Sequence, residues 1–196
     1  MFSPHPAPTL PRSHPLSPGL STMTSLRGMT CADLFAFNEV NLDALTETYH
    51  MPFYQQYLAT WPEYCVVAEA PGARLMGYIL GKAEGKGPQW HGHVTAVTVA
   101  PNYRRMRLAE KLMLVLEDVT AKVHDAYFVD LFVRVSNAVA IEMYTKFGYS
   151  VYRRVLQYYS GKEDAFDMRK AMPRDVEGKS VVPLDRPIRP HELEWD

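Results

Sequence analysis

The 196-residue chain has few cysteines, no surplus of positive charge and no long apolar run, and each shortage excludes a class of protein. Cys31 and Cys65 are too few for a disulfide framework, so a reducing compartment is expected. A formal charge of −1 argues against sequence-independent binding of nucleic acid, which needs an excess of Lys and Arg to neutralise phosphates. No apolar run approaches the length that crosses a bilayer. What remains is the composition of one globular domain.

The two ends of the chain differ in composition from its centre. Residues 1–22 hold six of the fifteen prolines and no acidic residue, which predicts a disordered, Pro-rich extension. The lack of acids is typical of a transit peptide, but the prolines are incompatible with the amphipathic helix that such a peptide needs. From Pro173 onward, four prolines and mixed charge predict an extended C-terminal arm over 173–196. The expected domain therefore spans 23–172.

Strand and helix patterns alternate between these ends. Alternation and apolar runs predict strands over 24–29, 65–70, 74–85, 93–99, 127–135, 149–160 and 165–172. Capping residues and helical spacing predict helices beginning at Thr30, Pro52, Leu108 and Asn137, the last closed by Gly148 in a left-handed conformation. The resulting order βααβββαβαββ predicts an α/β fold, a central mixed sheet with helices on both faces.

The segment VTVAPNYRRMRLAEKL (97–112) places three cations at the start of a helix. Arg104, Arg105 and Arg107 meet the positive end of the helix dipole there, which costs about 0.3–1 kcal/mol for each charge. A bound anion would remove that conflict, because free N–H groups at a helix start and arginine side chains together hold phosphates. The charge pattern alone leaves a solvated basic surface as the alternative.

This arrangement of strand, proline, R-R-x-x-x-A and helix resembles motif A of the Gcn5-related N-acetyltransferase superfamily, usually R/Q-x-x-G-x-G/A. The segment VRVSNAVAIEMYTKFGY (133–149) resembles motif B of the same superfamily. The chain departs from motif A at Arg107, where the motif's glycine lets the backbone approach phosphate. The resemblance implies that acetyl-CoA is bound by Val97, Thr98, Val99, Arg104, Arg105, Met106, Arg107, Leu108, Ala109, Asn137 and Tyr144.

Segments such as LTETYHMPFYQQYL, WHGHVTAVTVAP and DAFDMRKAM resemble the catalytic subunits of NatB N-terminal acetyltransferases. The resemblance runs from about Met23 to the region of Pro183. It implies transfer of acetyl from acetyl-CoA to the α-amine of nascent chains that begin Met-Asp, Met-Glu, Met-Asn or Met-Gln. It also implies a large helical-repeat auxiliary subunit, ribosome association and a cytoplasmic setting.

The chemistry of an α-amine agrees with such a reaction. Its pKa of about 7.7–8.0 leaves a useful neutral fraction near pH 7, so no strong base is needed. Orientation, an N–H donor for the oxyanion and an acid for the leaving thiolate are what help. The resemblance places the donor in the stretch 97–99 and the acid at Tyr144, which on its own fits a core aromatic residue better.

His91 and His93 share one face of their strand. Two histidines without a further Cys or His nearby are too few for zinc, so no metal is expected. The resemblance assigns His93 to the peptide side, as a catalytic residue that holds the peptide or relays the amine proton through water. The residues implied to bind the peptide are Glu47, Tyr49, His93, Thr95, Tyr158 and Tyr159. Adjacent strand residues point to opposite faces, so one of the two last tyrosines should be a packing residue unless the strand bulges.

Two other functions stay open at this point. A lysine acetyltransferase of the same fold would act on an amine of pKa about 10.4 and would need a committed base. A catalytically silent scaffold subunit that binds acyl-CoA would result if Arg107 spoils the phosphate loop.

The first two predicted helices carry more apolar surface than a small domain hides on one side, which predicts a partner surface. The residues concerned are Leu34, Phe35, Phe37, Val40, Leu42 and Leu45.

Overall fold

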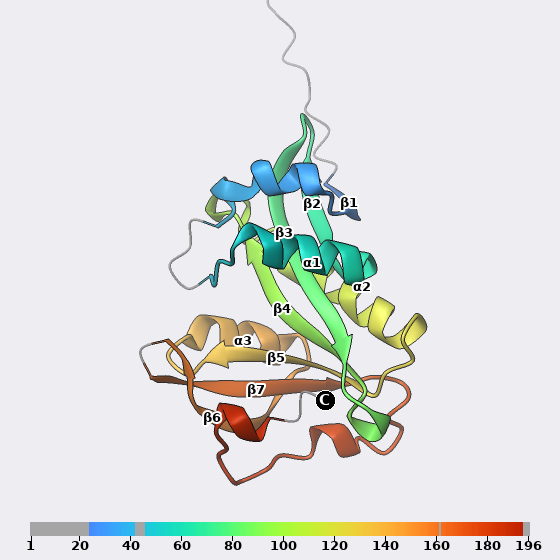
Figure 1. The fold of residues 1–196 in the computed structure, drawn as a ribbon, viewed down its shortest axis with the longest axis vertical. Helices are drawn as coiled ribbons and strands as arrows, with labels where there is room; N and C mark the ends of the chain where they lie inside the picture. Colours follow the sequence, from blue (N-terminus) through green and yellow to red (C-terminus); the bar gives the residue numbers. More distant parts are fainter. Residues whose placement is uncertain (1–23, 42–45, 161, 194–196) are drawn as a thin grey trace, which may run out of the picture.

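The computed structural model describes residues 24–41, 46–160 and 162–193, in which seven strands form one sheet of order β1-β2-β3-β4-β5-β7-β6 (Figure 1). The strands are β1 (Ser25–Gly28), β2 (Val66–Ala70), β3 (Arg74–Glu84), β4 (His91–Val99), β5 (Phe128–Arg134), β6 (Ser150–Tyr159) and β7 (Glu163–Ala171). The α-helices are α1 (Met51–Thr60), α2 (Leu108–Lys122) and α3 (Ala138–Lys146), and the first 3-10 helices are η1 (Cys31–Phe35) and η2 (Phe37–Glu39). The extension predicted over 1–22 lies outside the described residues.

The sheet is mixed, and the molecule divides into two halves at its parallel pair of strands. β4 and β5 run parallel and pair over residues 91–94 and 128–131, whereas the other neighbours are antiparallel. Beyond residue 94 the two strands separate, so that β1–β4 and β5–β7 form two differently oriented halves (Figure 1). The predicted α/β fold, a mixed sheet with helices on both faces, is confirmed.

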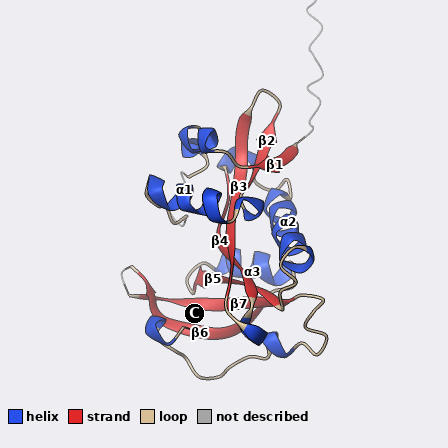
Figure 2. Ribbon diagram, turned by 45° about the vertical axis from the view of Figure 1, so that its right-hand side comes forward, coloured by secondary structure: helices blue, strands red, loops and turns tan. Residues whose placement is uncertain are grey.

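Helices cover the two faces of the sheet unequally. α1 lies on one side of β3 and β4, and α2 lies on the other (Figure 2). α2 and α3 share one core with β2–β5, whose centre includes Leu112, Leu116 and Leu131. α1, η1 and η2 close a second core on the opposite face around Tyr54 and Tyr78. The amphipathic pattern predicted the first core correctly from Leu108 to Val119, but Val123, at the end of the pattern, is 65% exposed just beyond α2.

The predicted helix from Thr30 is wrong in type, because the chain forms η1 and η2 instead of one α-helix. Leu34, Phe37 and Val40 are buried at intervals of three residues, which is the repeat of a 3-10 helix. These three side chains therefore fill the second core and expose no partner surface. Phe35 remains 80% exposed. Leu42 and Leu45 lie outside the described residues.

The C-terminal segment runs along the edge strand β6. Leu184 N–H donates to Tyr152 O at 2.7 Å. Leu156 N–H donates to Ile188 O at 2.8 Å, and Ile188 N–H donates to Arg154 O at 3.0 Å. Ile188 and Leu193 are buried against Val155. The segment thus covers an edge whose N–H and C=O groups would otherwise be open to pairing.

Candidate active site

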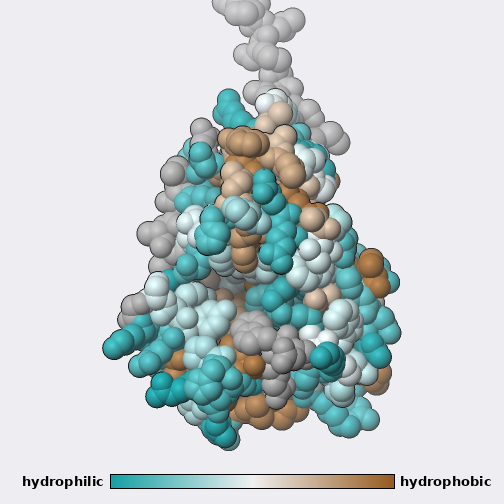
Figure 3. Space-filling view, in the orientation of Figure 1, coloured by the Kyte–Doolittle hydropathy of each residue, from teal (hydrophilic) through white to brown (hydrophobic). Residues whose placement is uncertain are grey.

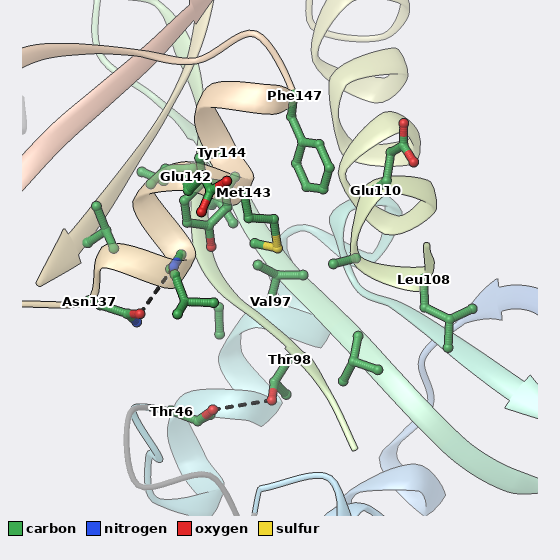
Figure 4. Close-up of a pocket in the computed structure, with 18 of the residues that line it drawn as sticks. Thr46, Val97, Thr98, Leu108, Glu110, Asn137, Glu142, Met143, Tyr144 and Phe147 are labelled. Atoms are coloured by element: carbon green, nitrogen blue, oxygen red, sulfur yellow. Dashed lines mark hydrogen bonds between the residues drawn. The ribbon is translucent and has the colours of Figure 1, made fainter. Parts of the chain in front are cut away.

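A cavity of about 870 Å³ opens where β4 and β5 separate. Its walls are the second half of β4, the end of β5, the loop that enters α2, and one side of α3 (Figure 4). Of the residues implied to hold acetyl-CoA, those that line it are Val97, Thr98, Val99, Arg104, Arg105, Arg107, Leu108, Ala109, Asn137 and Tyr144. Met106 is exposed and is not part of the lining.

β4 carries a bulge at the point of separation. Leu80 pairs with Ala96 and Gly81 pairs with Val94, so Thr95 is the extra residue on β4. Ala100 N–H donates to Met76 O on β3 at 2.8 Å. Because N–H groups alternate in direction along a strand, those of Val97 and Val99 point away from β3, toward the gap.

The loop before α2 has an unusual backbone at two arginines. Arg105 and Arg107 have φ values of 62° and 59°, a left-handed conformation that favours glycine. The side chain of Arg107, the N-cap residue of α2, makes no capping bond to the first turn, whose N–H groups can bind an anion. The Arg107 guanidinium bonds Glu110 with contacts of 2.5 and 2.8 Å. Arg107 therefore has the backbone conformation that a glycine adopts most readily.

α3 supplies the opposite wall. Asn137 caps this helix, because its Oδ1 accepts the Ala140 N–H at 3.2 Å. Tyr144 and Met143 extend from α3 into the cavity (Figure 4). Tyr144 is buried, and burial raises the pKa of its phenol well above the ordinary value, so the hydroxyl is a neutral donor at physiological pH.

A second group of side chains lies on the face of the sheet opposite α2. The His93 ring nitrogen Nδ1 lies 2.7 Å from Asp130 Oδ1 across the parallel pair. Thr95 Oγ1 donates to Tyr57 Oη at 2.9 Å, which ties the bulge to α1. Tyr49 stacks on Phe53 of α1 with ring centroids 4.1 Å apart. His93, Thr95 and Tyr49 therefore share the side expected for the peptide.

Tyr158 and Tyr159 both contact Phe132 because β6 bulges beside them. Gln157 has a φ of 54°, and the β6–β7 register shifts between Val155 and Tyr159. Tyr158 stacks on the Phe132 ring at 4.6 Å, and the Tyr159 hydroxyl donates to Phe132 O at 3.0 Å. Burial raises the pKa of both phenols. The bulge therefore interrupts the alternation of side chains along β6, and neither tyrosine points away from Phe132.

Arg134 connects three segments at the edge of this face. Its guanidinium bonds Glu47 at 2.5 Å and Glu163 at 2.8 Å, and it lies over the Tyr159 ring at 4.1 Å. The loop before α1 is thereby joined to the β6–β7 hairpin. Glu47, Thr95 and Tyr159 line the cavity as well, so the two faces meet at the gap between β4 and β5.

Four residues of this site were missed in the sequence: Glu84, Asp130, Phe132 and Arg134. Asp130 had a detectable signal, because a carboxylate inside the apolar run 127–135 is costly unless it is paired. Its pKa is low because the charges of His91 and His93 outweigh the effect of burial. The same carboxylate, against the effect of burial, raises the pKa of His91. Glu84 has no such signal, since it stands at the end of its strand.

Known proteins are similar to this chain in sequence and in fold. A model of the Acetyltransferase (GNAT) family matches residues 34–149. The catalytic subunit NAA20 of the N-terminal acetyltransferase B complex of Arabidopsis thaliana is 65% identical over 174 residues, which cover 89% of this chain and 100% of the relative. The catalytic subunit NAT3 of that complex in Saccharomyces cerevisiae is 42% identical, with coverage of 88% and 100%.

Solved structures of the same kind of enzyme have a similar fold. Chaetomium thermophilum Naa20 in complex with a bisubstrate analogue has a TM-score of 0.80 and 41% identity, covering 85% of this chain and 97% of its own. A NatB acetyltransferase complex bound to a bisubstrate inhibitor has a TM-score of 0.77 and 41% identity, covering 86% and 98%. In the described part of the present chain, no helix is both long and apolar enough to cross a membrane.

Proposed function

Because the chain belongs to the Acetyltransferase (GNAT) family and, within it, to the catalytic subunits of NatB N-terminal acetyltransferases, we propose that it acetylates protein N-termini that begin Met-Asp, Met-Glu, Met-Asn or Met-Gln. The chain is an N-terminal acetyltransferase, and acetyl-CoA is its acetyl donor. One observation carries the proposal: the cavity that begins at the basic loop before α2 extends to the gap between β4 and β5, where Glu47, Thr95 and Tyr159 also line it.

The cavity residues suit a pyrophosphate. The free N–H groups at the start of α2 and the side chains of Arg104 and Arg105 supply hydrogen-bond donors and positive charge at its mouth. The pantetheine arm then lies between β4 and α3, where Val97 and Val99 direct N–H groups into the gap. The thioester thus reaches the bulge, where the two faces meet.

Each residue at the gap has a separate role in acetyl transfer. The amine nitrogen forms a bond to the thioester carbonyl carbon, and the carbon–sulfur bond breaks. The N–H groups of Val97 and Val99 stabilise the negative charge that develops on the carbonyl oxygen. Tyr144, a buried neutral phenol, donates its proton to the departing thiolate. His93 takes the amine proton through water, with Asp130 2.7 Å from its Nδ1 and orienting the ring.

Selectivity for the second residue comes from polar groups on the peptide side. His93 and Tyr158 offer hydrogen-bond donors to a carboxylate or amide side chain, while Glu47 and Tyr49 flank the peptide N-terminus. The hydroxyl protons of Thr95 and Tyr159 already go to Tyr57 Oη and Phe132 O, so these two residues shape the pocket wall and donate nothing to the peptide. An apolar second residue would leave such groups buried and unpaired, at a cost of about 1–3 kcal/mol for each group. Two lost contacts correspond to roughly a hundredfold or more in kcat/KM.

We further propose a partner and a setting. The large helical-repeat auxiliary subunit docks on the N-terminal segment, where Phe35 is 80% exposed and apolar surface gathers near the top of the molecule (Figure 3). From the same family membership we infer that the enzyme acetylates nascent chains at the ribosome, in the cytoplasm.

The test is kcat/KM, with and without the auxiliary subunit, on peptides that begin Met-Asp, Met-Glu, Met-Leu and Ser. We expect Met-Asp and Met-Glu to exceed the other two by about a hundredfold or more. A peptide with a blocked N-terminus and an internal lysine tests the lysine alternative. Equal rates on all four free peptides would refute the selectivity, and absence of acetyl-CoA binding by calorimetry would indicate a scaffold.

A further inference from the structure

Four potential metal ligands meet on the peptide side of the sheet, from three strands. Glu84 ends β3, His91 and His93 lie on β4, and Asp130 lies on β5. One ligand atom from each of Glu84, His91 and His93 lies within 4.8 Å of the others. The two histidines alone are too few for a metal site, and it is the sheet pairing that adds the two carboxylates.

The separations between these atoms suit a tetrahedral ion better than hydrogen bonds. His91 Nε2 lies 3.7 Å from Glu84 Oε1 and 3.5 Å from Asp130 Oδ1, and His93 Nδ1 lies 4.0 Å from Glu84 Oε1. All three distances exceed the usual hydrogen-bond range. Zinc bonds of about 2.0–2.1 Å in a tetrahedron place neighbouring ligands roughly 3.3–3.4 Å apart. To reach that geometry these three pairs would close by a few tenths of an ångström, and His93 Nδ1 and Asp130 Oδ1, now 2.7 Å apart, would separate.

Two neighbouring contacts orient the ligands as metal sites require. His91 Nδ1 lies 2.6 Å from Gln89 O, so this nitrogen keeps its proton, and Nε2 faces the cluster as the ligand atom once any proton on it has passed to solvent. Lys82 bonds Glu84 Oε2 and leaves Oε1 directed inward. Within the described part of the chain Glu84 Oε1 is a buried side-chain oxygen that has no hydrogen-bond partner. A buried acceptor in that state is costly unless something binds it.

We propose that Glu84 Oε1, His91 Nε2 and His93 Nδ1 bind a zinc ion, with Asp130 Oδ1 as the fourth ligand, and that this ion inhibits acetylation reversibly. The ion replaces the proton shared by His93 and Asp130, now 2.7 Å apart, and that proton passes to solvent. The binding itself is independent of the proposed function. The inhibition rests on the proposed function, because a His93 that binds zinc can no longer interact with the peptide.

The test uses the full chain with its auxiliary subunit, treated with chelator and then titrated with Zn²⁺. Direct binding is measured by calorimetry and by the visible absorption bands of tetrahedral Co²⁺, neither of which depends on turnover. The variants are Glu84→Gln, which keeps the shape of the side chain, and His91→Gln. The matched control is His124→Gln, because His124 also pairs with a carboxylate, Glu63 at 2.9 Å, but lies outside the cluster.

We expect one Zn²⁺ per chain, and at least about tenfold weaker binding in Glu84→Gln and His91→Gln than in the parent and His124→Gln. Inhibition by Zn²⁺, measured against each variant's own metal-free rate, should weaken in the same order. Thermal unfolding checks that each variant is folded. If His91→Gln does not fold, Glu84→Gln alone tests whether the cluster binds zinc. Absence of stoichiometric binding, or binding unchanged in Glu84→Gln, would overturn the proposal. Zinc binding by a protein inactive on all peptides would refute the function and leave the site standing.

Discussion

Thr95 Oγ1 donates a hydrogen bond of 2.9 Å to Tyr57 Oη, and this bond fastens the bulge of β4 to α1. The bulge is where β4 leaves β5, so the position of one helix on the peptide side is coupled to the width of the gap. A helix that bears on a strand in this way can set the geometry of a site without contacting the reacting atoms.

Tyr57→Phe removes that bond and keeps the ring. We expect a higher KM for the peptide with little change in the KM for acetyl-CoA, and a loss of stability of about 0.5–1.5 kcal/mol. The control is Tyr64→Phe, which removes a hydroxyl bonded to Thr120 at 3.1 Å on the α2 face. Steady-state kinetics with each substrate varied in turn measures the KM for the peptide and the KM for acetyl-CoA separately. An equal rise in peptide KM in Tyr57→Phe and Tyr64→Phe would contradict the coupling.

Arg104→Ala and Arg105→Ala should raise the KM for acetyl-CoA several-fold and leave the fold and peptide binding largely intact. Both arginines line the mouth of the cavity, next to the free N–H groups of α2. Arg154→Ala is the control, since Arg154 is exposed on β6 and pairs with Asp164. Unchanged cofactor kinetics in both loop variants would remove the phosphate-binding assignment.

Arg107→Gly should leave the melting temperature unchanged or raise it. The residue has a φ of 59°, which is strained for an arginine and relaxed for glycine. The lost ion pair with Glu110 is exposed, and such pairs contribute little. Thermal unfolding measures the effect. A melting temperature lower by several degrees would mean that the Arg107–Glu110 pair holds the loop.

Tyr144→Phe should lower kcat by about a hundredfold, with little effect on either binding step, because only the proton donor is lost. Tyr149→Phe is the matched control, since Tyr149 is also buried but bonds Glu117 at 3.0 Å and lies outside the cavity lining. That variant should lose stability and keep its kcat. Equal kcat values in the parent and Tyr144→Phe would return Tyr144 to a packing role.

Asp33→Asn tests the junction between β1 and η1. The Arg27 guanidinium, bonded at 2.8 Å, holds the pKa of Asp33 at about 2, below its usual 3.8. A carboxyl whose folded pKa is depressed adds stability that is complete above its unfolded pKa and is lost as the pH falls through the folded value. The melting temperature of the parent should therefore exceed that of Asp33→Asn at pH 7, and the gap should close between about pH 4 and 2. Asp118→Asn, at an exposed pair with Lys122, should show no such convergence.

Alternation and apolar runs predicted the described strands of the sheet to within a few residues, and the spacing of Leu108, Leu112 and Leu116 predicted α2. The prediction of η1 and η2 as one helix failed because Leu34, Phe37 and Val40 repeat every three residues, a pattern that a search for amphipathic α-helix does not separate over so short a segment. Gly148, with a φ of 92°, closes α3 as predicted.

The sequence by itself determined the loop chemistry and the family, because the basic start of α2 and the two motifs are local and lie in unbroken runs of residues. Only the tertiary structure decided where β4 bulges, that Tyr158 and Tyr159 both reach Phe132, and that Glu84 and Asp130 join the two histidines of β4. Those relationships depend on strand register. Register is set by pairing between residues far apart in the chain, and a shift of one residue moves every side chain of a strand to the other face.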